Sequence, residues 1–244
     1  MNYLLLESVE STNSYVAVHA DELQDMTMVM AQHQTAGRGQ RGNSWEAEPG
    51  KNLTFTLFRR FDSFPARRQF AISEAVALAV ADFLARHGVN ASVKWPNDVY
   101  VDDRKICGIL IENSLMGSNL HHSRIGVGIN INQTRFLSDA PNPVSLAQLT
   151  GRELPLAEAS ARIGACLEKR LLQAERAPEQ LHEEFLSRLY RADGKPHPFR
   201  RRDSGLSFHG IIRDVRPDGF IEIEDTDSKS SSLFAFKEVE FLHI

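Results

Sequence analysis

The feature that most constrains the fold is a glycine-rich loop that is followed by a strand and not by a helix. Gly37, Gly39 and Gly42 have the spacing G-x-G-x-x-G, which in dinucleotide-binding proteins precedes a helix whose N-terminus meets the pyrophosphate. Here Pro49 follows, and residues 52–58 then alternate apolar and polar side chains, as a half-buried strand does. This context argues against a Rossmann fold. A P-loop is not indicated either, because no Gly-Lys-Ser/Thr run is present.

Two arginines give this glycine loop its chemical character. Arg38 and Arg41 lie between glycines, and glycine lets backbone N–H groups approach a ligand closely. Arginine recognises phosphate and carboxylate groups through paired hydrogen bonds. The loop is therefore predicted to bind an anion, and a solvated surface loop is the alternative interpretation. Trp45, just after the loop, fits either a binding site or the core.

Hydrophobic periodicity predicts a mixture of helices and strands. Helices are predicted at residues 15–23, 66–87, 154–175 and 178–189, and strands at residues 3–9, 27–34, 52–58, 92–94, 99–101, 105–112 and 123–132. Beyond residue 193 the pattern changes to short strands and turns, which is typical of a small β-barrel: residues 209–215, 220–224 and 233–236. We therefore expect an α+β chain. Residues 1–190 form a mixed or antiparallel sheet packed with helices, and residues 191–244 form the barrel.

Composition limits the class of binding partner and the cellular compartment that we expect. The chain has 28 Lys and Arg against 32 Asp and Glu, a formal net charge of −4, which argues against nucleic acid as the main partner. It has only two cysteines, Cys107 and Cys166, so no disulfide framework is predicted and a cytoplasmic setting is the simplest interpretation. Neither a signal peptide nor a membrane-spanning segment is indicated.

One lysine stands at the head of an apolar run. Lys105 precedes residues 106–111, which read as a buried strand. A lysine in this place is costly unless it extends to solvent or meets an anion, and both interpretations stay open. Asp98 reads equally as a turn residue. Cys107 is expected to be a buried structural thiol, since no base is placed beside it.

Two glycines two positions apart lie on one predicted strand. Gly126 and Gly128 face the same side of it. Strand glycines often mark the close approach of a ligand, although a bulge or a tight helix contact is the alternative. No metal site is predicted, because His121 and His122 point to opposite faces and no HExxH or CxxC motif occurs. Residues 200–202, three arginines, read as a solvated run.

These stretches together closely resemble the biotin protein ligases. The resemblance covers residues 5–150 and the terminal barrel, with the motifs in the family's order: Ser11-Thr12-Asn13, Gln34-Thr35-Ala36-Gly37-Arg38-Gly39, Trp45, Lys94-Trp95-Pro96-Asn97-Asp98, Arg104-Lys105-x-x-Gly108-Ile109-Leu110 and Gly126-x-Gly128-x-Asn130. It implies a class II synthetase-like catalytic domain with an SH3-like barrel. Ser11 lies too near the start for the helix-turn-helix that repressor members carry. The form without an N-terminal DNA-binding domain is therefore expected, with no direct DNA binding.

The resemblance implies a two-step reaction. Biotin and ATP give biotinyl-5′-AMP and pyrophosphate, with Mg²⁺ accompanying the nucleotide, and biotin then passes to one lysine of a biotin carboxyl carrier protein. A homodimer is left open. The implied catalytic residues are Lys105, Arg38 and Asp98. The implied biotin-binding residues are Ser11, Thr12, Asn13, Gln34, Gly37, Arg38, Gly39, Gln40, Lys105, Gly126 and Gly128. The implied ATP- and adenylate-binding residues are Arg38, Arg41, Trp45, Lys94, Asn97 and Asn130.

The chain departs from the family pattern in the glycine loop. Many relatives carry arginine where this chain has Gln40 and Asn43, so the loop has fewer cations with which to hold a phosphate. Three other functions remain open: a lipoate or octanoate ligase or transferase of related fold, a non-catalytic biotin-binding regulatory module, and an adaptor with an inactive catalytic domain. The glycine loop, the Lys94–Asp98 motif and the barrel favour biotin as the substrate.

Overall fold

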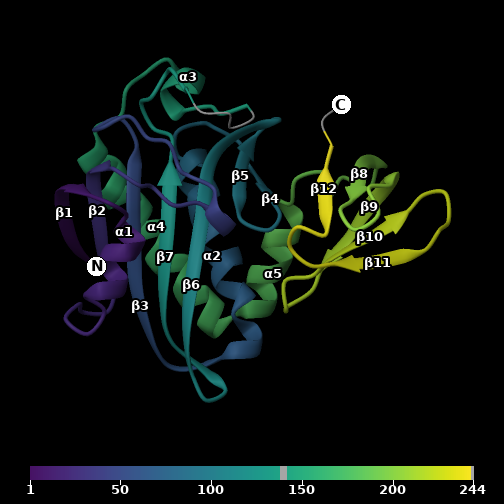
Figure 1. Cartoon of the computed structure of the whole chain (residues 1–244), viewed down its shortest axis with the longest axis horizontal. Helices are drawn as coiled ribbons and strands as arrows, with labels where there is room; N and C mark the ends of the chain where they lie inside the picture. The colour runs from purple at the N-terminus through teal and green to yellow at the C-terminus, as the bar shows by residue number, and fades with distance from the viewer. Residues whose placement is uncertain (138–141, 243–244) are drawn as a thin grey trace.

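The computed structural model of the chain describes residues 1–137 and 142–242, without the side chain of Arg41. A large mixed sheet with its helices comes first in the chain, and a smaller antiparallel sheet at the C-terminal end packs beside it (Figure 1). The expected α+β class is confirmed. Among the described residues, no helix is both long and apolar enough to cross a membrane.

The large sheet has seven strands in the order β1-β2-β3-β7-β6-β5-β4. Their bounds are β1 (Asn2–Val9), β2 (Thr27–Gln34), β3 (Leu53–Pro65), β4 (Ser92–Lys94), β5 (Asp98–Val101), β6 (Arg104–Met116) and β7 (Asn119–Ile129). Strands β1 and β2 pair in parallel and the other neighbours are antiparallel, so the sheet is mixed as expected. Strand β6 continues past its predicted end and β7 begins before its predicted start, because the two form one long hairpin. The predicted end at residue 132 was wrong, since β7 ends at Ile129.

Side-chain alternation gives this sheet two different faces. Leu57, Ile109 and Val127 are at most 3% exposed and belong to the main core, which they share with helices α2, α4 and α5. Thr56 and Gly126, one residue away in their strands, face the short helix α1 instead. The two faces therefore have different uses, since one is packed with apolar side chains and the other carries polar groups and glycines.

In the described part of the chain, five α-helices accompany the large sheet: α1 (Thr12–Val18), α2 (Phe70–Ala85), α3 (Leu146–Thr150), α4 (Leu156–Arg176) and α5 (Pro178–Ser187). Two predicted starts were wrong. The helix predicted from residue 66 begins at Phe70, because Ala66–Arg68 forms a 3-10 turn. The helix predicted at 15–23 spans Thr12–Val18, so its end was wrong as well as its start. Ser11 is extended at the N-cap position, and its side chain makes no capping hydrogen bond. Gly88, with φ of 75°, follows the end of α2, as predicted.

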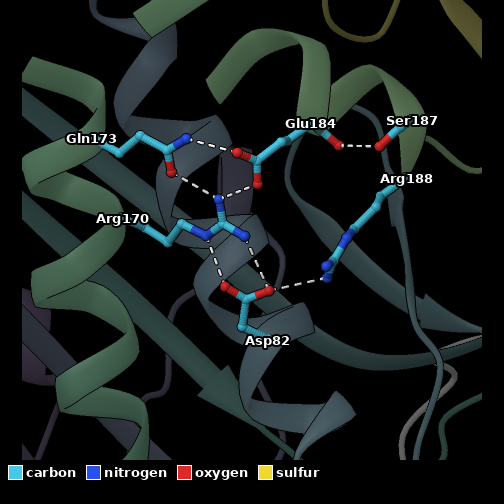
Figure 2. Close-up of polar contacts among 6 residues, drawn as sticks. All are labelled: Asp82, Arg170, Gln173, Glu184, Ser187 and Arg188. Atoms are coloured by element: carbon cyan, nitrogen blue, oxygen red, sulfur yellow. Dashed lines mark hydrogen bonds and ion pairs between the residues drawn. The ribbon is translucent and has the colours of Figure 1, made fainter. Parts of the chain in front are cut away.

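A buried arginine ties three of these helices together (Figure 2). Arg170 of α4 donates from Nε and Nη2 to the two carboxylate oxygens of Asp82 on α2, at 2.7 and 3.1 Å. Its Nη1 donates to Gln173 at 2.7 Å and to Glu184 of α5. Arg188 adds a second cation 3.1 Å from Asp82. The guanidinium is thus paired on every side, as a buried charge requires.

The smaller sheet has five antiparallel strands in the order β11-β10-β9-β8-β12. Their bounds are β8 (His197–Arg201), β9 (Ser207–Val215), β10 (Ile221–Asp225), β11 (Ser231–Phe234) and β12 (Val239–Phe241). Strands β8 and β12 were not predicted. The prediction of a solvated arginine run is wrong for Arg201, because β8 places its guanidinium 5.2 and 5.0 Å from the rings of Phe208 and Phe234. The division at residues 190 and 191 stays a prediction.

Candidate active site

A cleft of about 1090 Å³ opens on the sheet face that carries α1 and extends to the smaller sheet. It brings together most of the residues that the motifs singled out: Ser11, Thr12, Asn13, Gln34, Arg38, Gly39, Gln40, Trp45, Lys94, Asn97, Asp98, Lys105, Gly126 and Gly128. Gly37 and Asn130 do not line it. The side chain of Arg41 lies outside the described part of the chain.

One end of the cleft is a small polar pocket at the start of α1. The backbone N–H of Thr12, free because the helix begins there, donates to Oε1 of Gln34 at 2.8 Å. The Thr56 hydroxyl lies 2.8 Å from Oγ1 of Thr12 and 2.5 Å from Oδ1 of Asn13. Thr12 and Asn13 are each 3% exposed. Amide and hydroxyl groups thus surround a buried position at this end.

Gly126 and Gly128 both face the cleft, but protein side chains occupy the space that they leave. A Cβ atom at Gly126 would lie 2.5 Å from Oδ1 of Asn13, and one at Gly128 would overlap the ring of Trp45. Gly108 on β6 also lies under this ring, with 2.9 Å between its Cβ position and Cζ3 of Trp45. The glycines therefore seat the indole flat on the sheet, where Trp45 forms a wall of the cleft.

The lysine at the head of β6 meets an anion of the protein itself. Nζ of Lys105 lies 2.8 Å from Oδ1 of Asp98 and 5.8 Å from the centre of the Trp45 ring. The two charged side chains are 28% and 21% exposed. Asp98 is thus more than a turn residue, because the antiparallel register of β5 and β6 pairs it with Gly108 and brings it to Lys105.

The end of β4 supplies a second cation. Nζ of Lys94 donates to the hydroxyl of Tyr100 at 3.0 Å and lies 5.6 Å from the ring centre of Phe241 in β12. Burial lowers the pKa of Lys94, although the carboxylate of Asp98 opposes that shift. Burial also raises the pKa of Tyr100. The Asn97 amide donates to the backbone oxygen of Ile109 at 2.7 Å, so it fixes the turn beside Asp98.

The glycine loop has internal order. Gly39 donates to the oxygen of Asn43 at 2.7 Å, and Trp45 donates to that of Gly37 at 2.9 Å. Nη2 of Arg38 lies 3.0 Å from Oε1 of Glu112 on β6. The loop thus crosses the cleft with one arginine anchored to the sheet beneath it.

Asn130 is placed differently from the other motif residues. It is 2% exposed, its amide donates to the oxygen of Val144 at 3.1 Å, and its oxygen lies 3.5 Å from Nδ2 of Asn52. Its hydrogen bonds hold the end of β7 against the segment before α3. Any contact with a nucleotide therefore remains a prediction.

Comparison with known proteins agrees with this geometry. A family model, the biotin/lipoate A/B protein ligase family, matches residues 5–130, which is more than half of the 244 residues. The chain belongs to this family. The matched range contains the polar pocket, the glycine loop and the lysine strand, and it ends before the smaller sheet begins.

Individual members of the biotin/lipoate A/B protein ligase family differ in how much of this chain they match. The bifunctional ligase/repressor BirA of Escherichia coli is 36% identical over 139 residues, covering 57% of this chain and 43% of that protein. The biotin–[acetyl-CoA-carboxylase] ligase of Mycobacterium tuberculosis is 29% identical over 215 residues, covering 86% and 78%. The chain thus spans less than half the length of the BirA proteins that it matches.

A solved structure extends the similarity in fold to the C-terminal sheet. The biotin protein ligase from Aquifex aeolicus, in complex with biotin and ATP, has a TM-score of 0.79 and 21% identity, covering 100% of this chain and 99% of that one. The fold of this family member therefore includes both sheets.

Several cleft residues were not found from the sequence. Strand β5 contributes Tyr100, and the smaller sheet and its loops contribute Arg202, Lys237, Glu240 and Phe241. Nothing in the spacing of the residues from the smaller sheet marks them, because they reach the cleft only when the two sheets pack together. Thr54, which lines the cleft, carried a usable signal, since alternation places it on the face of Gly126. The same alternation places Thr56 and Glu112, behind the lining, on this face.

Proposed function

We propose that this protein is an ATP-dependent ligase that activates biotin as biotinyl-5′-AMP and transfers it to a lysine of a biotin carboxyl carrier domain. The family membership and the names of the similar proteins support this proposal. The cleft supports it further, because it places a buried polar pocket and two lysines in one continuous space.

The observation that carries the choice of biotin is the polar end of the cleft. Gln34, Thr12, Thr56 and Asn13 offer amide and hydroxyl groups at a buried position. The ureido ring of biotin has two N–H donors and one carbonyl acceptor that match such groups. An octanoyl chain has none, so it cannot exchange hydrogen bonds with these groups, which pair with one another in the structure. The pocket therefore favours biotin over lipoate and octanoate.

In the first step an oxygen of the biotin carboxylate attacks the α-phosphorus of ATP, and the bond to the β-phosphate breaks to release pyrophosphate. Two anions must meet, so the step needs positive charge fixed in advance. Lys105 and Arg38 supply that charge from β6 and from the glycine loop. Trp45 lies over Gly108 and Gly128 as a wall of the cleft and limits access of water to the mixed anhydride.

In the second step the acceptor amine attacks the biotinyl carbonyl, the carbonyl–oxygen bond to AMP breaks, and AMP leaves. The amine must lose a proton. Asp98 lies at the cleft beside Lys105 and is the carboxylate placed to accept a hydrogen bond from the incoming ammonium group. Lys105 stabilises the charge on the leaving phosphate in this step as well.

Mg²⁺ fits this proposal as an ion carried by the nucleotide. Among the described residues, no group of three potential metal-binding side chains exists. Magnesium in nucleotide sites is commonly bound through one or two carboxylates together with the phosphates, and Asp98 and Glu240 are the carboxylates lining the cleft that fit this role. The ion would reduce the charge of the phosphates when bound.

The partner in this proposal is the carrier domain, and direct DNA binding is not part of it. A cytoplasmic location fits, because ATP is a substrate and both cysteines are free, buried thiols. A direct test is to incubate purified protein with ATP, a biotin carboxyl carrier domain and either biotin, lipoate or octanoate, and to measure the intact mass of the carrier. Addition of one biotinyl group is expected. Preferential addition of lipoyl or octanoyl, or no addition, would contradict the proposal.

A further inference from the structure

Glu112 lies where the polar pocket meets the glycine loop. It is on β6, on the same face as Gly108, and its carboxylate is partly buried, with 26% of the side chain exposed. Oε1 pairs with Nη2 of Arg38 at 3.0 Å, and Oε2 accepts from Nδ2 of Asn13 at 3.3 Å. One carboxylate therefore contacts both the loop arginine and the pocket amide.

Through Glu112 a continuous set of hydrogen bonds crosses the site. It begins at Gln34, which accepts from Thr12, and continues through the Thr56 hydroxyl to Oδ1 of Asn13. The opposite end of the Asn13 amide donates to Glu112. The base of the pocket and the glycine loop are thus joined by side chains that are buried or half-buried.

We propose that Glu112 is a positioning residue that couples the polar pocket to the glycine loop; this inference rests on the proposed function. A carboxylate only accepts hydrogen bonds. Together with the backbone oxygen of Leu110, which accepts from the same Nδ2 at 3.4 Å, it fixes the Asn13 amide with the nitrogen toward β6 and the oxygen toward Thr56. It also holds Arg38 by one nitrogen, which leaves the other N–H groups of the guanidinium for an anionic substrate.

A plainer role for Glu112 is a cross-strand ion pair. Arg124 is its direct neighbour on β7, with Nη2 3.5 Å from Oε2. Such a pair contributes to sheet stability and nothing to the site. The two roles differ in which partner matters, because Arg124 does not line the cleft and Arg38 does.

Glu112→Gln is the informative change, since it keeps the shape and lets the side chain donate. Donation removes the fixed orientation of Asn13 and weakens the hold on Arg38. The expected result is a biotin Kd raised about tenfold, as for loss of a hydrogen bond to a charged group. Amide exchange across residues 37–45 should also lose most of its biotin-dependent protection. Arg124→Gln is the matched control and should change the Kd by less than about twofold.

The measurement is calorimetric titration with biotin, together with thermal unfolding of each variant. Unchanged or tighter binding by Glu112→Gln overturns the proposal, and so does an equal loss in Arg124→Gln. If Glu112→Gln does not fold, Glu112→Asp keeps the charge but cannot reach both partners. A loss of biotin affinity smaller than about tenfold in Glu112→Asp then supports the proposal, and an unchanged affinity overturns it. Wild-type protein that does not bind biotin would refute the proposed function itself, and this inference with it.

Discussion

Asp98 and Lys105 form an ion pair in the cleft, since Oδ1 of the carboxylate lies 2.8 Å from Nζ of the lysine. An incoming carboxylate or phosphate must therefore share or replace Asp98 as the partner of this ammonium group. When it does, Asp98 becomes available to another cation at the same place. In the proposed ligase reaction, Lys105 would first bind the anionic substrate, and Asp98 would then meet the acceptor lysine.

Lys105→Ala should leave the fold intact and remove most adenylate formation. Its side chain contacts Asp98 and Trp45 in the cleft and is partly exposed, so little packing is lost. Removal of one preorganised charged contact typically costs about 2–4 kcal/mol of transition-state stabilisation. The rate of biotinyl-AMP formation in a single turnover measures this loss. Lys195→Ala is the control, because Lys195 is exposed. A folded Lys105→Ala protein with near-normal rates would remove this lysine from the mechanism.

Gly128→Val should impair biotin binding more than stability, because the new side chain would overlap Trp45. Overpacking of this kind costs about 1–3 kcal/mol of folding free energy, whereas displacement of the indole removes a wall of the cleft. The double variant with Trp45→Ala checks the cause. If the glycine acts through the indole, the two losses in biotin affinity measured by calorimetry are not additive. Simple additivity, or unchanged affinity in Gly128→Val, would contradict this assignment.

Arg170→Met should lower the free energy of unfolding by about 1–3 kcal/mol, because it removes the hydrogen bonds of two part-buried carboxylates, while Arg188 stays 3.1 Å from Asp82. Asp82 and Glu184 both depend on this guanidinium (Figure 2). Arg162→Met, in the exposed pair with Glu158 on the same helix, is the control and should cost less than about 1 kcal/mol. Urea unfolding measures both. Equal losses would show that burial of the Arg170 network is unimportant.

The contact between α2, α5 and β9 should make stability depend on pH. Nδ1 of His182 lies 2.7 Å from Oε1 of buried Glu74, and Nε2 lies 3.7 Å from Oδ1 of Asp214. The hydrogen bond that His182 donates to Glu74 raises the pKa of His182, with burial opposing, and burial raises the pKa of Glu74. The folded state thus binds protons more tightly. Its stabilisation is complete below the ordinary histidine value of 6.5 and is lost as pH rises through the raised pKa of His182.

The matching measurement is the difference in Tm between wild type and His182→Gln, taken from about pH 5.5 to about pH 9. This window covers the pH range in which an ordinary or a raised histidine pKa is titrated. The wild-type advantage should shrink as pH rises. A difference is needed because burial lowers the pKa of His87 and of His122, which gives the opposite slope. A constant or growing advantage would show that His182 does not hold a proton between the two carboxylates.

The sequence predicted which residues gather at the cleft better than it predicted the contacts between them. The strand after the glycine loop and the alternation that puts Gly126 and Gly128 on one face were local signals, and the structure has both. At Gly126 the close neighbour is Asn13 of α1, which agrees with the alternative of a tight helix contact, and the approach of a ligand stays a prediction. The ion pair of Lys105 with Asp98 was not predicted, because it depends on the register of β5 and β6. Arg202 and Lys237 reach the cleft only because the two sheets pack together. This packing produces no periodic pattern in the sequence.

The most direct test of the account is ATP–pyrophosphate exchange with purified protein, because it isolates acyl activation from transfer. Labelled pyrophosphate should enter ATP only when biotin is present, and neither lipoate nor octanoate should replace biotin. No exchange with biotin would contradict an activating enzyme and leave a non-catalytic biotin-binding module. Exchange driven by lipoate or octanoate in place of biotin would show that the polar pocket formed by Gln34, Thr12, Thr56 and Asn13 selects a different acid.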